Sequence, residues 1–96
     1  MRIARPPSGF SIIVTELAQT ALDASIPSVP RLTEVWDGVR ERLKFTAHRE
    51  GDRLPDGRSL LQVDGDASFG IPKIAVIYTV LGDTVTVHRI LVVALQ

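Results

Sequence analysis

Two strand-like runs separated by a glycine–aspartate pair constrain this chain more than any other feature. The stretch IAVIYTVLGDTVTVHRILV, residues 74–92, is rich in Val, Ile and Thr, which favour strands. Gly82-Asp83 suits the positive φ that a two-residue hairpin turn requires. The sequence therefore predicts two antiparallel strands, over residues 73–81 and 84–93. Residues 90–93 are apolar on both faces, which is typical of a strand in the middle of a sheet.

The N-terminal half predicts one strand followed by two helices. An apolar run over residues 10–14 indicates the strand, and Thr15 is suited to cap a helix over residues 16–24. The second helix is indicated by apolar residues that recur on one face, namely Leu32, Val35, Trp36, Val39 and Leu43. We expect Trp36 to lie in the core. A further strand over residues 58–63 precedes the hairpin.

The order of these elements predicts an α+β fold with the order β-α-α-β-β-β. The simplest architecture packs the two helices on one face of a four-stranded, mainly antiparallel sheet. Pro6-Pro7-Ser8-Gly9 is turn chemistry, so residues 1–9 are expected to form a flexible arm before a single domain over residues 10–96.

Charge and composition exclude several classes of function. Eleven Lys and Arg residues oppose eleven Asp and Glu residues, so the zero net charge counts against broad nonspecific binding of nucleic acid. The absence of cysteine excludes disulfides and thiolate chemistry. No apolar stretch approaches the ~20 residues of a membrane span, and the N-terminus has no signal-peptide run. We therefore expect a cytoplasmic protein with no membrane partner.

Two stretches of the chain carry a family resemblance. In VIYTVLGDTVTVHRIL, residues 76–91, a strand with Tyr78 is followed by a Gly-Asp turn, a run of valines and then Arg89 before two aliphatic residues. In FSIIVTELA, residues 10–18, a strand is followed by a threonine cap and a helix start. Together with the order of elements, these stretches resemble the RelE/ParE superfamily of toxins from type II toxin–antitoxin systems. The matching hairpin positions are Tyr78, Gly82, Asp83, Val85, Val87, Arg89, Ile90 and Leu91.

The resemblance implies two activities. RelE-like members bind the ribosome and cleave mRNA, ParE-like members inhibit DNA gyrase, and an antitoxin protein neutralises both. We therefore expect a toxin-like protein that binds a macromolecular target, gyrase or the ribosome, and is neutralised by an antitoxin. Two alternatives stay open. One is a ribosome-dependent, metal-independent mRNA endonuclease with a reduced site, and the other is a non-toxic protein-interaction domain that kept the fold.

The chain departs from the nuclease pattern at most positions that carry chemistry. Leu60-Leu61-Gln62-Val63 stands where the family's basic residues would fall, and Ala75 stands near a usual arginine. No histidine with a basic, aromatic tail follows Leu91. A reduced site would consist of Arg58, Lys73, His88 and Arg89. Arg58 and Lys73 are predicted to converge if their strands are neighbours, whereas the adjacent His88 and Arg89 are predicted to point to opposite faces.

The remaining polar residues suggest structural roles. His48 is expected at the C-terminus of the second helix, where a positive charge is favourable. Residues 40–58 are locally basic, which fits a solvated helix face or, as the alternative, an anionic partner. Asp64, Asp66 and Asp83 are turn chemistry, so we expect no metal and no cofactor.

The apolar C-terminal strand suggests an interaction edge. Residues 90–95, from Ile90 to Leu95, form a hydrophobic run that predicts docking of a partner or of a second copy, giving a homodimer. Substitution of Val92 or Leu95 by Asp is then expected to abolish the assembly.

Overall fold

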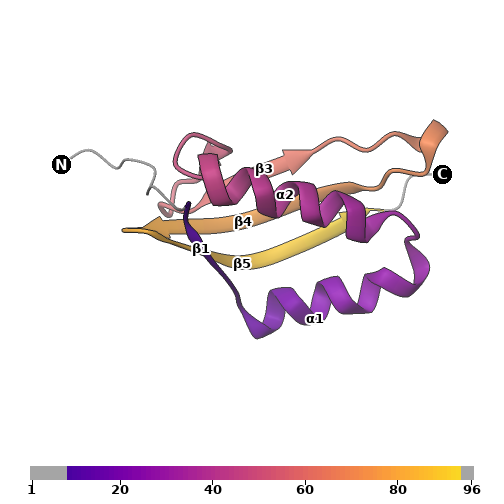
Figure 1. Cartoon of the computed structure of the whole chain (residues 1–96), viewed down its shortest axis with the longest axis horizontal. Helices are drawn as coiled ribbons and strands as arrows, with labels where there is room; N and C mark the ends of the chain where they lie inside the picture. The colour runs from indigo at the N-terminus through magenta and orange to yellow at the C-terminus, as the bar shows by residue number, and fades with distance from the viewer. Residues whose placement is uncertain (1–8, 94–96) are drawn as a thin grey trace.

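The computed structural model describes residues 9–93 as a five-stranded mixed sheet with two α-helices (Figure 1). The strands lie in the order β1-β5-β4-β3-β2. In chain order the elements are β1 (Ser11–Val14), α1 (Glu16–Ser25), α2 (Leu32–Thr46), β2 (Asp52–Arg53), β3 (Ser59–Val63), β4 (Lys73–Leu81) and β5 (Thr84–Val93). Short 3₁₀ turns follow α1 (Ile26–Ser28) and β3 (Ala67–Phe69).

The predicted α+β class and the two helices are confirmed, but the predicted number of strands is wrong. The fifth strand is β2, whose Asp52 and Arg53 lie opposite Leu60 and Ser59 of β3. Two consecutive charged residues carry no strand pattern, so β2 forms because the connection after α2 folds back along β3. The arm predicted for residues 1–9 lies, except for Gly9, outside the described residues.

The hairpin has the bounds that the sequence predicts and occupies the middle of the sheet. β4 and β5 are antiparallel, and Gly82 has φ +62° in the turn between them. Positive φ at the first central residue alone is the pattern of a type II′ turn. β1 runs parallel to β5, from Ser11 opposite Thr84 to Val14 opposite Val87. β1 is therefore an edge strand beside the hairpin, and the sheet is mixed.

Alternating side chains divide the sheet into a helix-facing side and an open side. Most helix-facing side chains of β4 and β5 are almost completely buried, namely Ile74, Val76, Tyr78, Val85, Val87 and Ile90, while Val80 and Val92 are partly buried against the same core. They share one core with apolar residues of both helices, including the predicted Trp36. Figure 1 shows α2 lying across the sheet and α1 running beside β5. Both helices therefore cover the same face.

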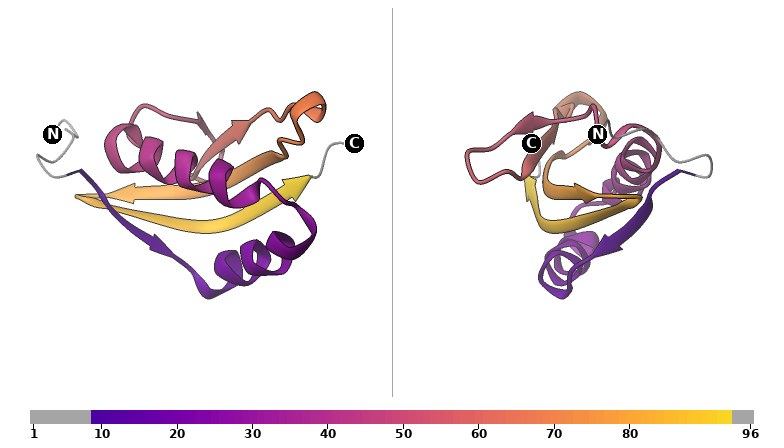
Figure 2. Two further views of the ribbon diagram at one scale, coloured as in Figure 1. Left: turned by 45° about the vertical axis from the view of Figure 1, so that its right-hand side comes forward. Right: turned by 90° about the vertical axis from the view of Figure 1, so that its left-hand side faces the viewer.

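A β-bulge interrupts β5 where α1 begins. Ile77 lies opposite Arg89 while the next residue, Tyr78, lies opposite Val87, so His88 has no opposite residue on β4. The Thr15 hydroxyl donates to the His88 carbonyl oxygen at 3.2 Å and accepts from the Ala18 N–H at 3.3 Å. The predicted cap of α1 is thereby tied to the bulge. The long hairpin is visibly curved (Figure 2), as expected next to a bulge.

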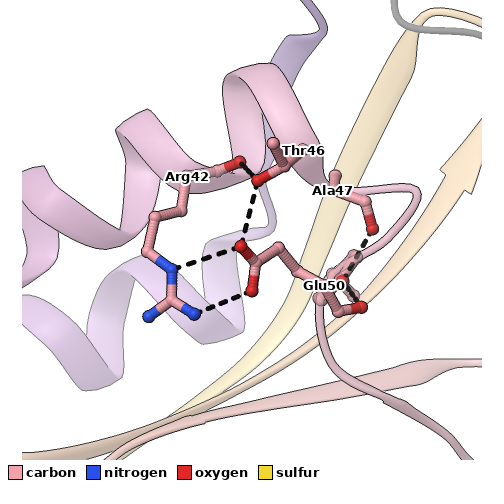
Figure 3. Close-up of polar contacts among 5 residues, drawn as sticks. Arg42, Thr46, Ala47 and Glu50 are labelled. Carbon is pink, nitrogen blue, oxygen red and sulfur yellow. Dashed lines mark hydrogen bonds and ion pairs between the residues drawn. The ribbon is translucent and has the colours of Figure 1, made fainter.

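Tyr78 anchors the chain segment that leaves α2. Its Oη lies 2.8 Å from the Ala47 carbonyl oxygen and 2.6 Å from the Glu50 carbonyl oxygen, so one hydroxyl proton serves two acceptors. The Glu50 carboxylate also accepts from Arg42 at 2.7 Å (Figure 3), which lowers the pKa of Glu50. Thr46 lies 3.0 Å from the same carboxylate. These contacts hold the end of α2 against β4.

The Tyr78 contacts predict a pH-dependent stability. Burial raises the pKa of Tyr78 to about 12, and the nearby Glu50 carboxylate adds to the shift. The unfolded chain loses this proton near pH 10. Because the folded pKa is the higher one, the stabilisation is complete below pH 10 and is lost as the pH rises from about 10 to about 12. Tyr78 is the only tyrosine, so tyrosinate absorbance in native and denatured samples measures both values directly. Coincident titration curves would contradict the prediction.

Candidate functional site: the open face of the sheet

The open face of the sheet is the surface that carries the residues singled out by the sequence. Strand alternation places on it every second residue of β3 and β4, and on β5 a series that shifts by one at the bulge. We call this surface the open sheet face. It consists of Ser11, Ile13, Asp52, Leu60, Gln62, Lys73, Ala75, Ile77, Thr79, Leu81, Thr84, Thr86, His88, Arg89, Leu91 and Val93.

Much of the open sheet face is apolar. Leu91 is 57% exposed and Val93 is 52% exposed, and Ile13 is 53% exposed on the neighbouring β1. Leu60, Ile77 and Arg89 lie side by side across β3, β4 and β5. Leu91 and Ala75 form the next pair on the same face, two residues further along β5 and β4. Leu91, Val93 and Ala75 are neighbours on this face, whereas Ile13 lies opposite Thr86, beyond His88 and Arg89. Clustered exposed apolar side chains with polar residues around them mark interaction surfaces.

His88 and Arg89 lie together on this face. Arg89 lies opposite Ile77, and His88 Nε2 forms a 2.9 Å hydrogen bond with Oγ1 of Thr79, which also points to the open side. The prediction that the two residues point to opposite faces is therefore wrong. The bulge inserts one residue between Val87 and Ile90, which both face the helices. Two consecutive side chains consequently share the open side.

Arg58 and Lys73 do not converge, although β3 and β4 are neighbours as the prediction required. The register places Arg58 next to the Ser59–Tyr78 pair, whereas Lys73 lies just beyond the Val63–Ile74 pair. The two positions are separated by about 20 Å along the antiparallel strands. Arg58 is also engaged by Asp56, with an ion pair at 2.6 Å in the β2–β3 turn.

The four residues of the predicted reduced site therefore do not form one catalytic cluster. Metal-independent RNA cleavage needs a base, an acid and positive charge at the phosphate. His88 and Arg89 supply a base and one cation on the same face. Lys73 lies opposite Val93 and is about 13 Å along β4 from Ile77, the neighbour of Arg89. The arrangement suits binding by an apolar surface with one arginine more than it suits acid–base cleavage.

Only half of the apolar residues at the end of β5 are exposed on the open side. Ile90 is buried in the core and Val92 packs against the core, whereas Leu91 and Val93 point to the open side. Substitution of Val92 by Asp would therefore perturb the core as well as any interface. Leu95 lies outside the described residues. The predicted homodimer through this strand stays a prediction that Leu91 and Val93 can test.

The comparisons with known proteins identify no relative. Neither family models nor curated proteins nor solved structures match the chain. The resemblance to RelE/ParE toxins therefore stays a prediction. Within residues 9–93, no group of three or more His, Asp or Glu side chains is placed to hold a metal ion. Neither helix in this part of the chain is long and apolar enough to cross a membrane.

The bulge is the feature that the sequence reasoning missed, and the sequence contains a signal for it. Val85 and Val87 are two residues apart, as in a regular strand, but the next core residue, Ile90, follows after three. A spacing of three inside an alternating pattern indicates an inserted residue. This spacing would have placed His88 and Arg89 on one face.

Proposed function

We propose that the chain is a toxin-like protein of a type II toxin–antitoxin system that acts by binding a macromolecular target and is neutralised by an antitoxin. The observation that carries the proposal is the open sheet face, where Leu91 and Val93 are more than half exposed beside Arg89. Exposed apolar side chains around a single arginine are typical of protein-binding hot spots.

The composition of this face favours a protein target over a nucleic acid. Nucleic-acid binding depends on an excess of positive charge. The chain has zero net charge, and much of this face is apolar. DNA gyrase is therefore the favoured target over ribosomal RNA. The order of the main elements, with the short β2 added, is compatible with the RelE/ParE resemblance and supports the same proposal.

One observation favours the mRNA endonuclease as a second candidate. Because His88 and Arg89 share a face, a phosphate bound by Arg89 would lie near an imidazole able to act as a base. In this alternative His88 is essential. In the binding proposal His88 is dispensable, since its ring is held by Thr79 at the margin of the apolar rows.

Induced expression in bacteria tests the proposal. We expect wild-type expression to arrest growth, with pulse labelling showing loss of DNA synthesis before protein synthesis. Leu91→Asp should relieve the arrest, because a charge in the centre of an apolar interface reduces affinity by about tenfold or more. Leu17→Asp on α1 is the matched control, since Leu17 is 61% exposed but lies away from the open sheet face. His88→Ala should remain toxic.

The other outcomes separate the alternatives. Arrest of protein synthesis that His88→Ala abolishes would identify the endonuclease. Normal growth at verified soluble expression would overturn the toxin proposal and leave a non-toxic interaction domain. Equal relief by Leu17→Asp and Leu91→Asp would show that the open sheet face has no special part in the arrest.

A further inference from the structure

A pocket opens on the helix-facing side of the sheet, beyond the end of α2. α2 ends at Thr46, whereas β4 continues to Leu81, so the β4–β5 hairpin projects past the helix (Figure 1). The uncovered end of the sheet borders a pocket of about 450 Å³. Volumes in this range hold small molecules rather than single ions.

The strand register explains why polar side chains reach this pocket. Arg53 lies opposite Ser59, which lies opposite Tyr78, so the three residues form one row across β2, β3 and β4. Residues of one row share a face. Tyr78 is completely buried under the end of α2, so Arg53 and Ser59 also belong to the helix-facing side. Both line the pocket.

The apolar part of the lining comes from the hairpin. Val80 follows Tyr78 by two residues on the same side of β4, but it is only partly buried because α2 has ended. Leu81 is 83% exposed at the tip and also borders the pocket, although strand alternation directs its side chain to the open side. One wall of the pocket is therefore apolar, while the opposite rim carries Arg53.

The charges of the lining all have one sign. The polar side chains that face the pocket are those of Arg53, His48 and Ser59, and none of its lining residues carries a carboxylate. Two acidic side chains near Arg53 in the sequence are paired with other arginines. Glu50 binds Arg42, and Asp56 binds Arg58. Asp52 lies opposite Leu60, on the other face of the sheet from Arg53.

Arg53 has unused binding capacity, whereas the unpartnered ring nitrogen of His48 is shut off from the pocket. Among residues 9–93, Arg53 forms no side-chain hydrogen bond or ion pair, and the His48 Nδ1 atom is buried without a hydrogen-bond partner. His48 lies just beyond the C-terminus of α2. The partial negative charge of that helix end, about half a unit, is smaller than the full charge of Arg53.

We propose that this pocket binds a small organic anion. Its carboxylate or phosphate oxygens accept hydrogen bonds from Arg53, and its apolar part lies against Val80. A guanidinium group binds both oxyanions in the same two-pronged geometry. The site is separate from Arg89 and the apolar rows of the open sheet face, so it stands whether or not the proposed toxin function holds.

Ligand titrations of the full chain, followed through its backbone amide NMR signals, test the proposal. The probes are phenyl phosphate, benzoate, inorganic phosphate and the neutral benzyl alcohol. We expect phenyl phosphate or benzoate to shift the amides of Ala47, Arg53, Ser59 and Val80, with benzyl alcohol at least about tenfold weaker. Binding of the phosphate ester alone, or of benzoate alone, would identify the oxyanion and support the site. Inorganic phosphate should bind more weakly than phenyl phosphate, because it lacks the apolar part.

Paired arginine variants locate the binding charge. Arg53→Gln is expected to weaken binding by about tenfold or more, since a charge-assisted hydrogen bond is lost. Arg49→Gln removes the same charge from a neighbouring exposed residue that does not line the pocket, and should leave the affinity unchanged. Equal weakening by both variants, equal affinity for benzyl alcohol, shifts centred on Arg89, or no binding of any anion would overturn the proposal.

Discussion

Gly51→Ala is expected to lower the free energy of unfolding by about 2–4 kcal/mol. Gly51 has φ +75°, a conformation that costs an L-residue about 1–2 kcal/mol. A Cβ atom at this position would lie 2.8 Å from the Leu60 carbonyl oxygen and 3.2 Å from the Tyr78 hydroxyl. The Leu60 oxygen belongs to the backbone of β3, so relief of the contact must shift the strand that β2 is paired with.

Gly57→Ala is the matched control for this substitution. Gly57 also has positive φ, at +90°, but a Cβ atom there meets no atom within 4 Å. We expect only the conformational cost, about 1–2 kcal/mol. Urea unfolding followed by the fluorescence of Trp36, the only tryptophan, measures both variants. Equal losses in the two variants would show that the close approach at Gly51 does not contribute.

Tyr78→Phe is expected to cost about 1–3 kcal/mol, which corresponds to a fall in Tm of roughly 4–8 °C for each kcal/mol in a domain of this size. The substitution keeps the buried ring and removes the one donor shared by the carbonyl oxygens of Ala47 and Glu50. A buried acceptor left without a partner loses its hydration without compensation. The segment after α2 should therefore detach more readily from β4.

Thr79→Val provides the comparison for Tyr78→Phe. It removes the neighbouring hydrogen bond to His88, which lies at the partly exposed open side, where water can replace the lost partner. We expect a smaller cost, within about 1 kcal/mol. Thermal unfolding at neutral pH compares the two variants, and Tyr78→Phe should also lose the weakening between pH 10 and pH 12. An unchanged Tm for Tyr78→Phe would mean that solvent already reaches both carbonyl oxygens.

The periodic parts of the chain could be predicted because they depend on neighbours a few residues apart. The i, i+3, i+4 spacing from Leu32 to Leu43 indicates a helix with one buried face, and those positions do face the core, with Val35 partly buried beside it. The alternation around Gly82 predicts the hairpin with its observed bounds. Thr15 caps α1 through a contact with Ala18, which lies only three residues away.

The candidate site was less predictable, because strand register and bulges depend on partners that are distant in the sequence. Strand alternation alone placed His88 and Arg89 on opposite faces, and only the pairing of β4 with β5 shows the inserted residue that brings them together. Likewise, neighbouring strands were not enough to bring Arg58 to Lys73. The antiparallel register puts them at opposite ends of β3 and β4.

β2 and the pocket also depend on contacts between residues that are distant in the sequence. Nothing in Asp52-Arg53 favours a strand, and β2 exists because Gly51 permits the backbone to approach Leu60 of β3. That pairing sets Arg53 on the helix-facing side, next to the end of α2. Local patterns were therefore enough for the helices, the hairpin and their buried faces, since side-chain period and propensity act over a single turn or strand. Tertiary contacts decided which charged residues meet, because register is fixed by the packing of whole elements.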